Sequence, residues 1–215
     1  MVHPDAARAA LASLLPRPLA STRTTRACAI AAAAALTAVA AQFSIPLPFT
    51  PAPLTLQPTL VLLAGVALGA RAGAASQLTY LIIGALGAPI FAWSPVLLPG
   101  LGRVFGPTGG YLLSYPLAAW LVGYVVERGR RRGYTSSIVG VLAMTAGLAT
   151  IYLGGMASLL AFAPDSGGWG DGTVAFQLGV LPFVGADLLK IALAAPLLST
   201  LASVRTRWFD AAPPR

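Results

Sequence analysis

The chain has 215 residues, of which 57% are hydrophobic and only 9% are charged, and its mean hydropathy is +0.78. This composition leaves too little polar surface for a soluble globular domain, so we expect an integral membrane protein built as one domain. Lysine and arginine outnumber the acidic residues by 14 to 6. Because no basic stripe with interleaved aromatic residues accompanies this excess, we expect no nucleic-acid partner and attribute the charge to membrane topology.

The N-terminal region contains three arginines and several prolines without a sustained apolar pattern, which predicts a cytoplasmic tail over residues 1–25. The first membrane span is predicted at about Arg26 to Phe43. A cleavable signal peptide is an alternative, because an arginine-bearing segment precedes an apolar run that ends in small residues. The long preceding tail and the number of further spans favour a retained span.

A segment with four prolines, SIPLPFTPAP at residues 44–53, predicts an extended, semi-rigid loop at the membrane surface. Five more apolar segments follow, each near the ~20 residues needed to cross a ~30 Å hydrocarbon core: Leu54 to Ala70, Ala72 to Phe91, Thr108 to Val126, Ser137 to Ala163, and Val184 to Val204. The stretch Val174 to Leu181 is too short to cross and predicts a surface helix or a re-entrant turn.

The arginines predict the orientation of these spans. With the N-terminus in the cytoplasm, Arg71, the RGRRR cluster at 128–132 and the C-terminal arginines all lie inside, whereas Arg103 is the single outer arginine. We therefore expect an all-α integral membrane protein, a six-transmembrane-helix bundle over residues 26–204 with both termini cytoplasmic. The last residues, 205–215, are predicted to be a cytoplasmic tail.

Asp187 and Lys190 are the only opposite charges that the chain places together within an apolar segment of membrane length. An ionisable residue there is costly, so a functional role is the default expectation. The i, i+3 spacing places both side chains on one helix face, and Asp187 is predicted in the first turn of the last span, near the outer side and the positive end of the helix dipole. The pair predicts a polar recognition site open to the outside; an ion pair that only joins two helices is the alternative.

A glycine- and proline-rich stretch, WSPVLLPGLGRVFGPTGGY, runs from Trp93 to Tyr111. Irregular backbone at membrane depth requires surrounding protein or a cavity, so the stretch is predicted to cap a pocket in which Trp93, Thr108 and Tyr111 contact a ligand. A tight turn with aromatic anchors at the membrane interface explains it equally well. For Gln77 and Tyr80, one helical turn apart on the third span, an interhelical hydrogen bond and a ligand contact both stay open.

Small residues recur at a spacing of four on two predicted spans. Ala27, Ala31 and Ala35 form one such face, and Gly65 and Gly69 form another, so both faces can admit a neighbouring helix at close range. The alanine face predicts either a surface for a partner protein or packing within the chain.

Catalytic and metal-binding constellations are missing from the apolar part of the sequence. His3 and Cys28 are the only residues of their kinds, so a histidine-based metal cluster or a Ser/His pair within the membrane has no residues to use. We expect no metal, no cofactor in this chain, and no enzyme activity.

Four segments resemble the BioY family, the biotin-binding S components of energy-coupling-factor (ECF) transporters. In chain order these are PLPFTPAPLTLQ, LGARAGAASQLTYLIIGALGAPIFA, GLGRVFGPTGGYLL and GVLPFVGADLLKIALAAPL, and the resemblance covers roughly residues 26–203. It implies a six-helix membrane subunit that binds biotin at the outer face of a prokaryotic cell membrane. It also implies partners, namely a transmembrane coupling protein and ATPase subunits that use the ATP.

The resemblance also implies roles for particular residues. Asp187 and Lys190 are expected at the polar end of biotin, including its ureido ring, and the alanine face of the first span is expected to meet the coupling protein. Residues expected to bound or cover the pocket are Tyr80, Trp93 and Tyr111, with Phe49 and Thr50 in a lid.

The sequence departs from the family pattern at Arg103, which stands at an often apolar position. Its guanidinium is a candidate ligand for the valerate carboxylate of biotin, and an exposed loop arginine without a role is the alternative. For the whole chain, the alternatives are a stand-alone permease for biotin or another small vitamin, an intramembrane enzyme, and a purely structural membrane protein.

Overall fold

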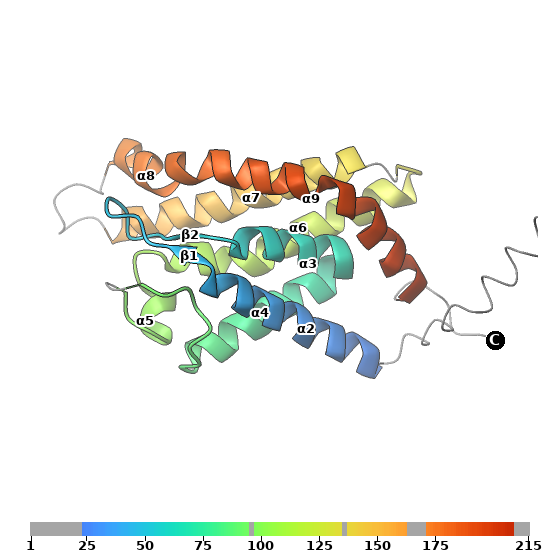
Figure 1. Ribbon diagram of the computed structural model, residues 1–215, viewed down its shortest axis with the longest axis horizontal. Coiled ribbons are helices and arrows are strands. Elements are labelled where there is room, and N and C mark those ends of the chain that lie inside the picture. Colours follow the sequence, from blue (N-terminus) through green and yellow to red (C-terminus); the bar gives the residue numbers. More distant parts are fainter. Residues whose placement is uncertain (1–22, 95–96, 135–136, 163–170, 209–215) are drawn as a thin grey trace, which may run out of the picture.

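The computed structural model describes residues 23–94, 97–134, 137–162 and 171–208, and this part of the chain is predominantly helical (Figure 1). The helices are α2 (Arg23–Gln42), α3 (Gln57–Leu68), α4 (Ala70–Ala85), α5 (Leu101–Val104), α6 (Gly109–Arg131), α7 (Ser137–Ala161), α8 (Gly172–Gly179) and α9 (Leu181–Trp208). The two strands, β1 (Ser44–Ile45) and β2 (Leu54–Thr55), pair in antiparallel register with Ser44 opposite Thr55.

Four of the described helices are long and apolar enough to cross a membrane: α2, α6, α7 and the part of α9 from Leu181 to Leu198. By contrast, α3 has 12 residues and α4 has 16, which correspond to about 18 and 24 Å. The fold is thus a mostly helical membrane-protein fold with at least four candidate spans in the described residues. The predicted total of six spans stays a prediction.

The predicted second and third spans were longer than the corresponding helices, α3 and α4. The second begins at Gln57, because Leu54 and Thr55 pair with β1 as a strand and a proline stands at the helix start, where its missing N–H costs nothing. The third ends at Ala85, and Gly87 then adopts a φ of 102° that ordinary residues rarely take.

The ends of the predicted membrane domain also shift. Helix α2 begins at Arg23, and α9 continues past Val204 to Trp208, so residues 205–208 are helical. The rest of the predicted tails, 1–22 and 209–215, lies outside the described residues. Helix α8 confirms the short helix predicted near Val174, although it begins two residues earlier, where the Asp171 carboxylate accepts a hydrogen bond from the Thr173 N–H at 3.0 Å.

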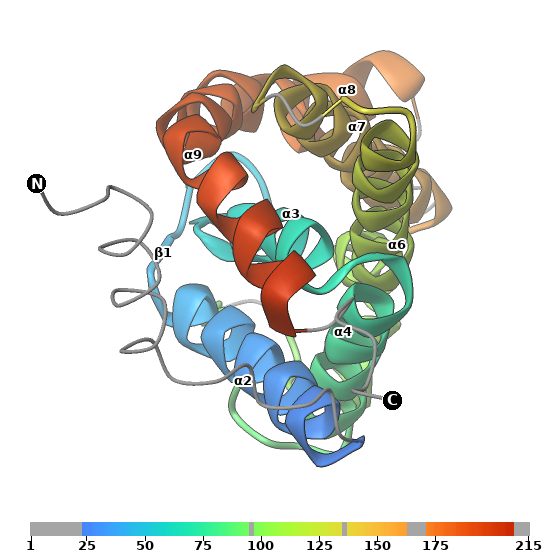
Figure 2. The same ribbon diagram turned by 90° about the vertical axis from the view of Figure 1, so that its right-hand side faces the viewer.

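Helix α3 lies at the centre of the bundle, in contact with α2, α4, α6, α7 and α9 (Figure 2). Its sequence is apolar almost all round, which is typical of a fully surrounded helix, and Val61 and Leu62 are completely buried. A Cβ at Gly65 would lie 2.5 Å from the Ala119 carbonyl oxygen. The predicted close approach at Gly65 is therefore confirmed as a contact between α3 and α6.

The two ends of the bundle differ (Figure 1). Strands β1 and β2 and helices α5 and α8 lie at one end, on the left of the figure, which we call the strand end. The C-terminal turn of α6, with Arg128, Arg130 and Arg131, lies at the other, which we call the arginine end. There the Ala70 N–H at the start of α4 donates a hydrogen bond to Glu127 Oε1 at 2.9 Å.

Candidate functional site

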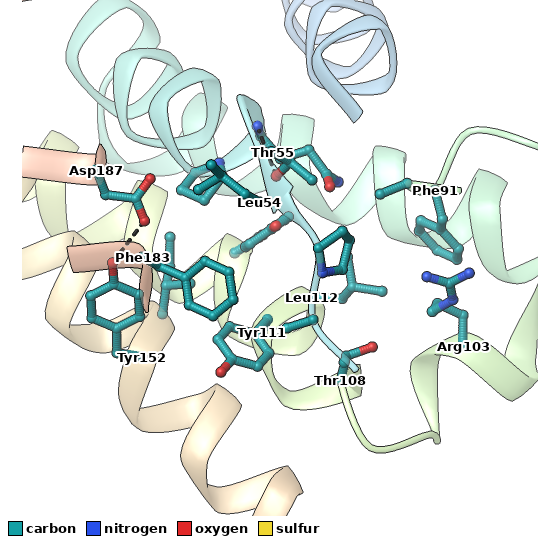
Figure 3. A pocket seen from close by; sticks show the side chains of 17 residues that line it. Leu54, Thr55, Phe91, Arg103, Thr108, Tyr111, Leu112, Tyr152, Phe183 and Asp187 are labelled. Atoms are coloured by element: carbon teal, nitrogen blue, oxygen red, sulfur yellow. Dashed lines mark hydrogen bonds between the residues drawn. The ribbon is translucent and has the colours of Figure 1, made fainter. Parts of the chain in front are cut away.

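A cavity of about 610 Å³, including its open mouth, lies at the strand end (Figure 3). Five parts of the chain form its walls: Ala52, Pro53, Leu54, Thr55, Gln57 and Pro58 around β2; Phe91, Ala92 and Arg103 between α4 and α6; Thr108, Tyr111, Leu112 and Tyr115 at the start of α6; Ile151 and Tyr152 on α7; Phe183 and Asp187 on α9.

Asp187 is the acidic residue of the cavity wall, and only 3% of it is exposed. Its Oδ1 accepts a hydrogen bond from Lys190 Nζ at 2.5 Å, and its Oδ2 accepts one from the Tyr152 hydroxyl at 2.7 Å. Lys190 also donates to the Thr55 carbonyl oxygen at 2.7 Å. The carboxylate thus has a donor on each oxygen, and each oxygen retains lone-pair capacity for another.

The predicted position of Asp187 in the first helical turn is wrong. Helix α9 begins at Leu181, so the carboxylate lies in the second turn, where the helix dipole acts weakly. Its charge is stabilised by Lys190 and Tyr152 instead. Because Lys190 faces Thr55 and Asp187 and does not line the cavity, the carboxylate is the member of the pair that a ligand would meet first.

Arg103 lies on the opposite side of the cavity from Asp187 (Figure 3). It is 7% exposed, and its guanidinium donates to the carbonyl oxygens of Leu98 and Leu97 at 3.3 and 3.4 Å. Burial lowers the pKa of this guanidinium, yet an arginine stays charged at any physiological pH. Within the described residues no carboxylate pairs with it, so the cavity has a carboxylate at one pole and an uncompensated cation at the other.

Aromatic side chains form much of the surface between these poles. Tyr111 donates its hydroxyl to the Gly179 carbonyl oxygen at 2.6 Å, which orients its ring at the wall. Tyr80 is completely buried behind the wall, where its ring stacks on Tyr115 at 6.5 Å and meets Phe91 edge-on at 5.4 Å. Its hydroxyl accepts from Gln57 Nε2 at 2.6 Å. Tyr80 therefore supports the wall from behind.

The structure brings some of the other predicted residues to the cavity and leaves others outside. Thr108 lines it, and Thr50 is buried beside it, accepting a hydrogen bond from the Ala52 N–H at 3.3 Å. Phe49 and Trp93 are 54% and 62% exposed and are not part of the lining. Contact of these two residues with a ligand stays a prediction.

Gln77 forms the interhelical bond that was one of its two interpretations. Its side chain is completely buried, and Nε2 donates to Thr37 Oγ1 on α2 at 3.2 Å. The alanine face of α2 does not pack within the described part of the chain. Ala27, Ala31 and Ala35 are all exposed.

Sequence reasoning missed several wall residues, notably Gln57, Phe91, Tyr115, Tyr152 and Phe183. A tyrosine within an otherwise apolar helix was the available signal for Tyr152, since a buried phenol needs a hydrogen-bond partner. The described residues contain no group of three His, Cys, Asp or Glu side chains that could hold a metal ion.

Comparisons with known proteins find relatives of this chain. The family model described as the BioY family matches residues 10–207. A probable biotin transporter BioY of Pyrococcus horikoshii is 40% identical over 167 residues, which are 78% of this chain and 90% of that protein. The biotin transporter BioY of Thermotoga maritima is 36% identical over 162 residues, which are 75% and 86% of the two chains.

A solved structure has the same fold. The crystal structure of the S-component for biotin from an ECF-type ABC transporter superposes with a TM-score of 0.73, covering 86% of this chain and 95% of that chain at 19% identity.

The hydrogen bond from Tyr152 to Asp187 is expected to contribute to stability. Replacing Tyr152 with Phe removes a donor to a buried charge, which should cost about 1.5–3 kcal/mol and lower the melting temperature of the detergent-solubilised protein. The control is Tyr124→Phe, because Tyr124 is 43% exposed and its loss of a hydroxyl should change stability by less than about 0.5 kcal/mol. Equal melting temperatures for the two variants would contradict this role of Tyr152.

Proposed function

Because the chain belongs to the BioY family, we propose that it is the membrane subunit that captures biotin at the outer face and delivers it inward. The observation that carries this proposal is the cavity with a buried carboxylate at one pole and a buried guanidinium at the other. Biotin has a matching distribution of groups, with a ureido ring at one end, an apolar sulfur-containing ring fused to it, an apolar chain, and a carboxylate at the other end. The family is one of transporters, so the chain is not an enzyme.

At the Asp187 pole, the proposal places the ureido ring. A ureido group presents two N–H donors and one carbonyl acceptor, and the Asp187 carboxylate can accept from an N–H while it keeps its bonds to Lys190 and Tyr152. Charge-assisted hydrogen bonds of this kind are about twice as strong as neutral ones. The ring would thus be recognised by its donors, while Tyr111 and Phe183 cover its apolar faces.

At the opposite pole, the proposal places the valerate carboxylate on Arg103. A guanidinium fork binds a carboxylate in bidentate geometry, and the two carbonyl bonds to Leu97 and Leu98 leave further N–H groups available. Phe49 and Thr50, in the segment before the cavity wall, would cover the bound ligand as part of a lid, and Trp93 would contact the ligand as a further aromatic residue.

The chain is a membrane protein, and we infer its location as the cytoplasmic membrane of a prokaryote, crossed six times with both termini inside. In this arrangement α3 and α4 serve as the second and third spans, and the cavity opens outward at the strand end. The arginines of the arginine end then lie in the cytoplasm, which agrees with the positive-inside rule.

Coupling to ATP would require partner subunits, because the chain has no nucleotide-binding motif. The proposed partners are an ECF transmembrane coupling protein and its ATPases, and the exposed face of Ala27, Ala31 and Ala35 is the proposed contact surface. A small-residue face of this kind lets a second helix approach closely in the bilayer. A stand-alone permease would leave this face without a role.

The proposed function is tested by equilibrium binding of labelled biotin to the purified protein. Asp187→Asn should weaken binding at least about tenfold, because it removes a charge-assisted hydrogen bond to the ligand. Lys190→Ala should also weaken binding, because it removes the ion pair that holds the Asp187 carboxylate in place. Asp171→Asn, which changes an acid outside the cavity, should bind like the parent protein. A parent protein that does not bind biotin, or two variants that bind as tightly as the parent, would refute the site.

The role of Arg103 is tested with a second ligand, biotinamide, which lacks the negative charge. Arg103→Gln should weaken biotin binding about tenfold or more and leave biotinamide binding unchanged, and Arg103→Lys should lie between parent and Gln for biotin. If Arg103→Gln weakens both ligands equally, Arg103 maintains the shape of the wall and does not recognise the carboxylate.

The partner surface is tested in cells that contain the coupling protein and ATPases. Ala31→Leu, which adds bulk to the alanine face, should reduce biotin uptake severalfold while biotin binding by the purified variant stays unchanged. Ala32→Leu changes an exposed alanine about 100° around the same helix and should transport like the parent. Equal uptake by all three proteins would contradict the surface.

A further inference from the structure

One exposed face of α6 carries six side chains in a regular order towards the arginine end. They lie three or four residues apart and so form one stripe, which we call the α6 stripe: Leu113, Leu117, Trp120, Tyr124, Arg128 and Arg131. The first four are 52%, 56%, 41% and 43% exposed, and both arginines are exposed. The stripe thus changes from aliphatic to aromatic to cationic along the helix.

The aromatic part of the stripe is a stacked pair. The rings of Trp120 and Tyr124 lie 5.3 Å apart and are nearly parallel, at 10°. Both rings lie outside the core of the bundle, so the helix holds a flat aromatic surface that faces outward. Trp and Tyr at such exposed positions prefer the depth of the lipid headgroups and glycerol.

The cationic part has no competing acid on the same face. Arg128 and Arg131 form no ion pair within the described residues. Glu127, their neighbour in the sequence, directs Oε1 to the Ala70 N–H of α4. The two guanidinium groups are therefore available to an external anion, and arginine forks are well suited to phosphate oxygens.

The dimensions of the stripe match one lipid in one leaflet. Leu113 and Tyr124 are eleven residues apart, about 16 Å along the helix, and Arg128 lies about 6 Å beyond Tyr124. Half of the hydrocarbon core is about 15 Å thick. We infer that the α6 stripe binds one anionic phospholipid lengthwise, with its phosphate on Arg128 and Arg131, its glycerol region on the stacked rings, and an acyl chain on Leu117 and Leu113.

This inference is tested by quenching of Trp120 fluorescence. Trp93, Trp169 and Trp208 are replaced with Phe, and the protein is reconstituted in phosphatidylcholine vesicles that contain 10 mol% phosphatidylglycerol. The acyl-chain bromine quencher is placed either on the phosphatidylglycerol or on an equal amount of the phosphatidylcholine. We expect the two quenching values to show that phosphatidylglycerol is at least about fivefold enriched over phosphatidylcholine beside Trp120. A factor of about five is the attraction of one basic residue for an anionic lipid.

Two variants separate a specific site from general charge attraction. Arg128→Gln with Arg131→Gln should abolish the enrichment, whereas Arg71→Gln, at an exposed arginine of the same end but on α4, should retain it. Equal quenching by the two brominated lipids would overturn the inference and leave the arginines to a protein partner. A loss in Arg71→Gln of half or more of the loss in the double variant would also overturn it, because Arg71→Gln removes one charge and the double variant two, and the attraction would then follow net charge.

Discussion

A buried carboxylate requires hydrogen-bond donors, and the arrangement of the cavity depends on how Asp187 obtains them. Lys190 comes from the same helix, but Tyr152 comes from α7, and Lys190 in turn reaches the Thr55 carbonyl 135 residues away in sequence. These three bonds join α9, α7 and the strand segment around one charge. Removing one partner of such a group costs several kcal/mol, so the walls of the cavity are held by the same contacts that prepare the carboxylate for a ligand.

The two poles of the cavity are supported in different ways. Asp187 lies within a long helix and is held by Lys190 of that helix and Tyr152 of α7, whereas Arg103 lies in a four-residue helix and, among the described residues, donates hydrogen bonds to the nearby carbonyls of Leu97 and Leu98. Sites built on long helices are positioned more accurately than sites on loops. A ligand with different ends would therefore be oriented by the rigid Asp187 pole, and the Arg103 pole would adjust to the length of its chain.

The sequence predicted those features of the structure that depend on neighbouring residues, and it missed those that depend on residues distant in the chain. The long helices α2, α6, α7 and α9 were predicted within a few residues, because apolar length is a local signal. The Asp187–Lys190 pair was found for the same reason. The start of α3 was predicted three residues too early and the start of α9 three residues too late, since β2 pairs with a strand about ten residues earlier and α9 begins directly after α8. Tyr152 was missed because its partner lies 35 residues away, and an isolated tyrosine in an apolar helix does not reveal which helix it faces.

The hydrogen bond from the Ala70 N–H to Glu127 has a mechanical consequence. The first amide of α4 is satisfied by a side chain of α6, and Gly123 allows the backbone at Gly69 and Ala70 to approach α6 closely. A slide of α4 along α6 by one turn, about 5.4 Å, would leave that amide without its acceptor and separate the glycine contact. Helices α4 and α6 should therefore move as one rigid body, and any change in the shape of the subunit must be taken up at other helix contacts.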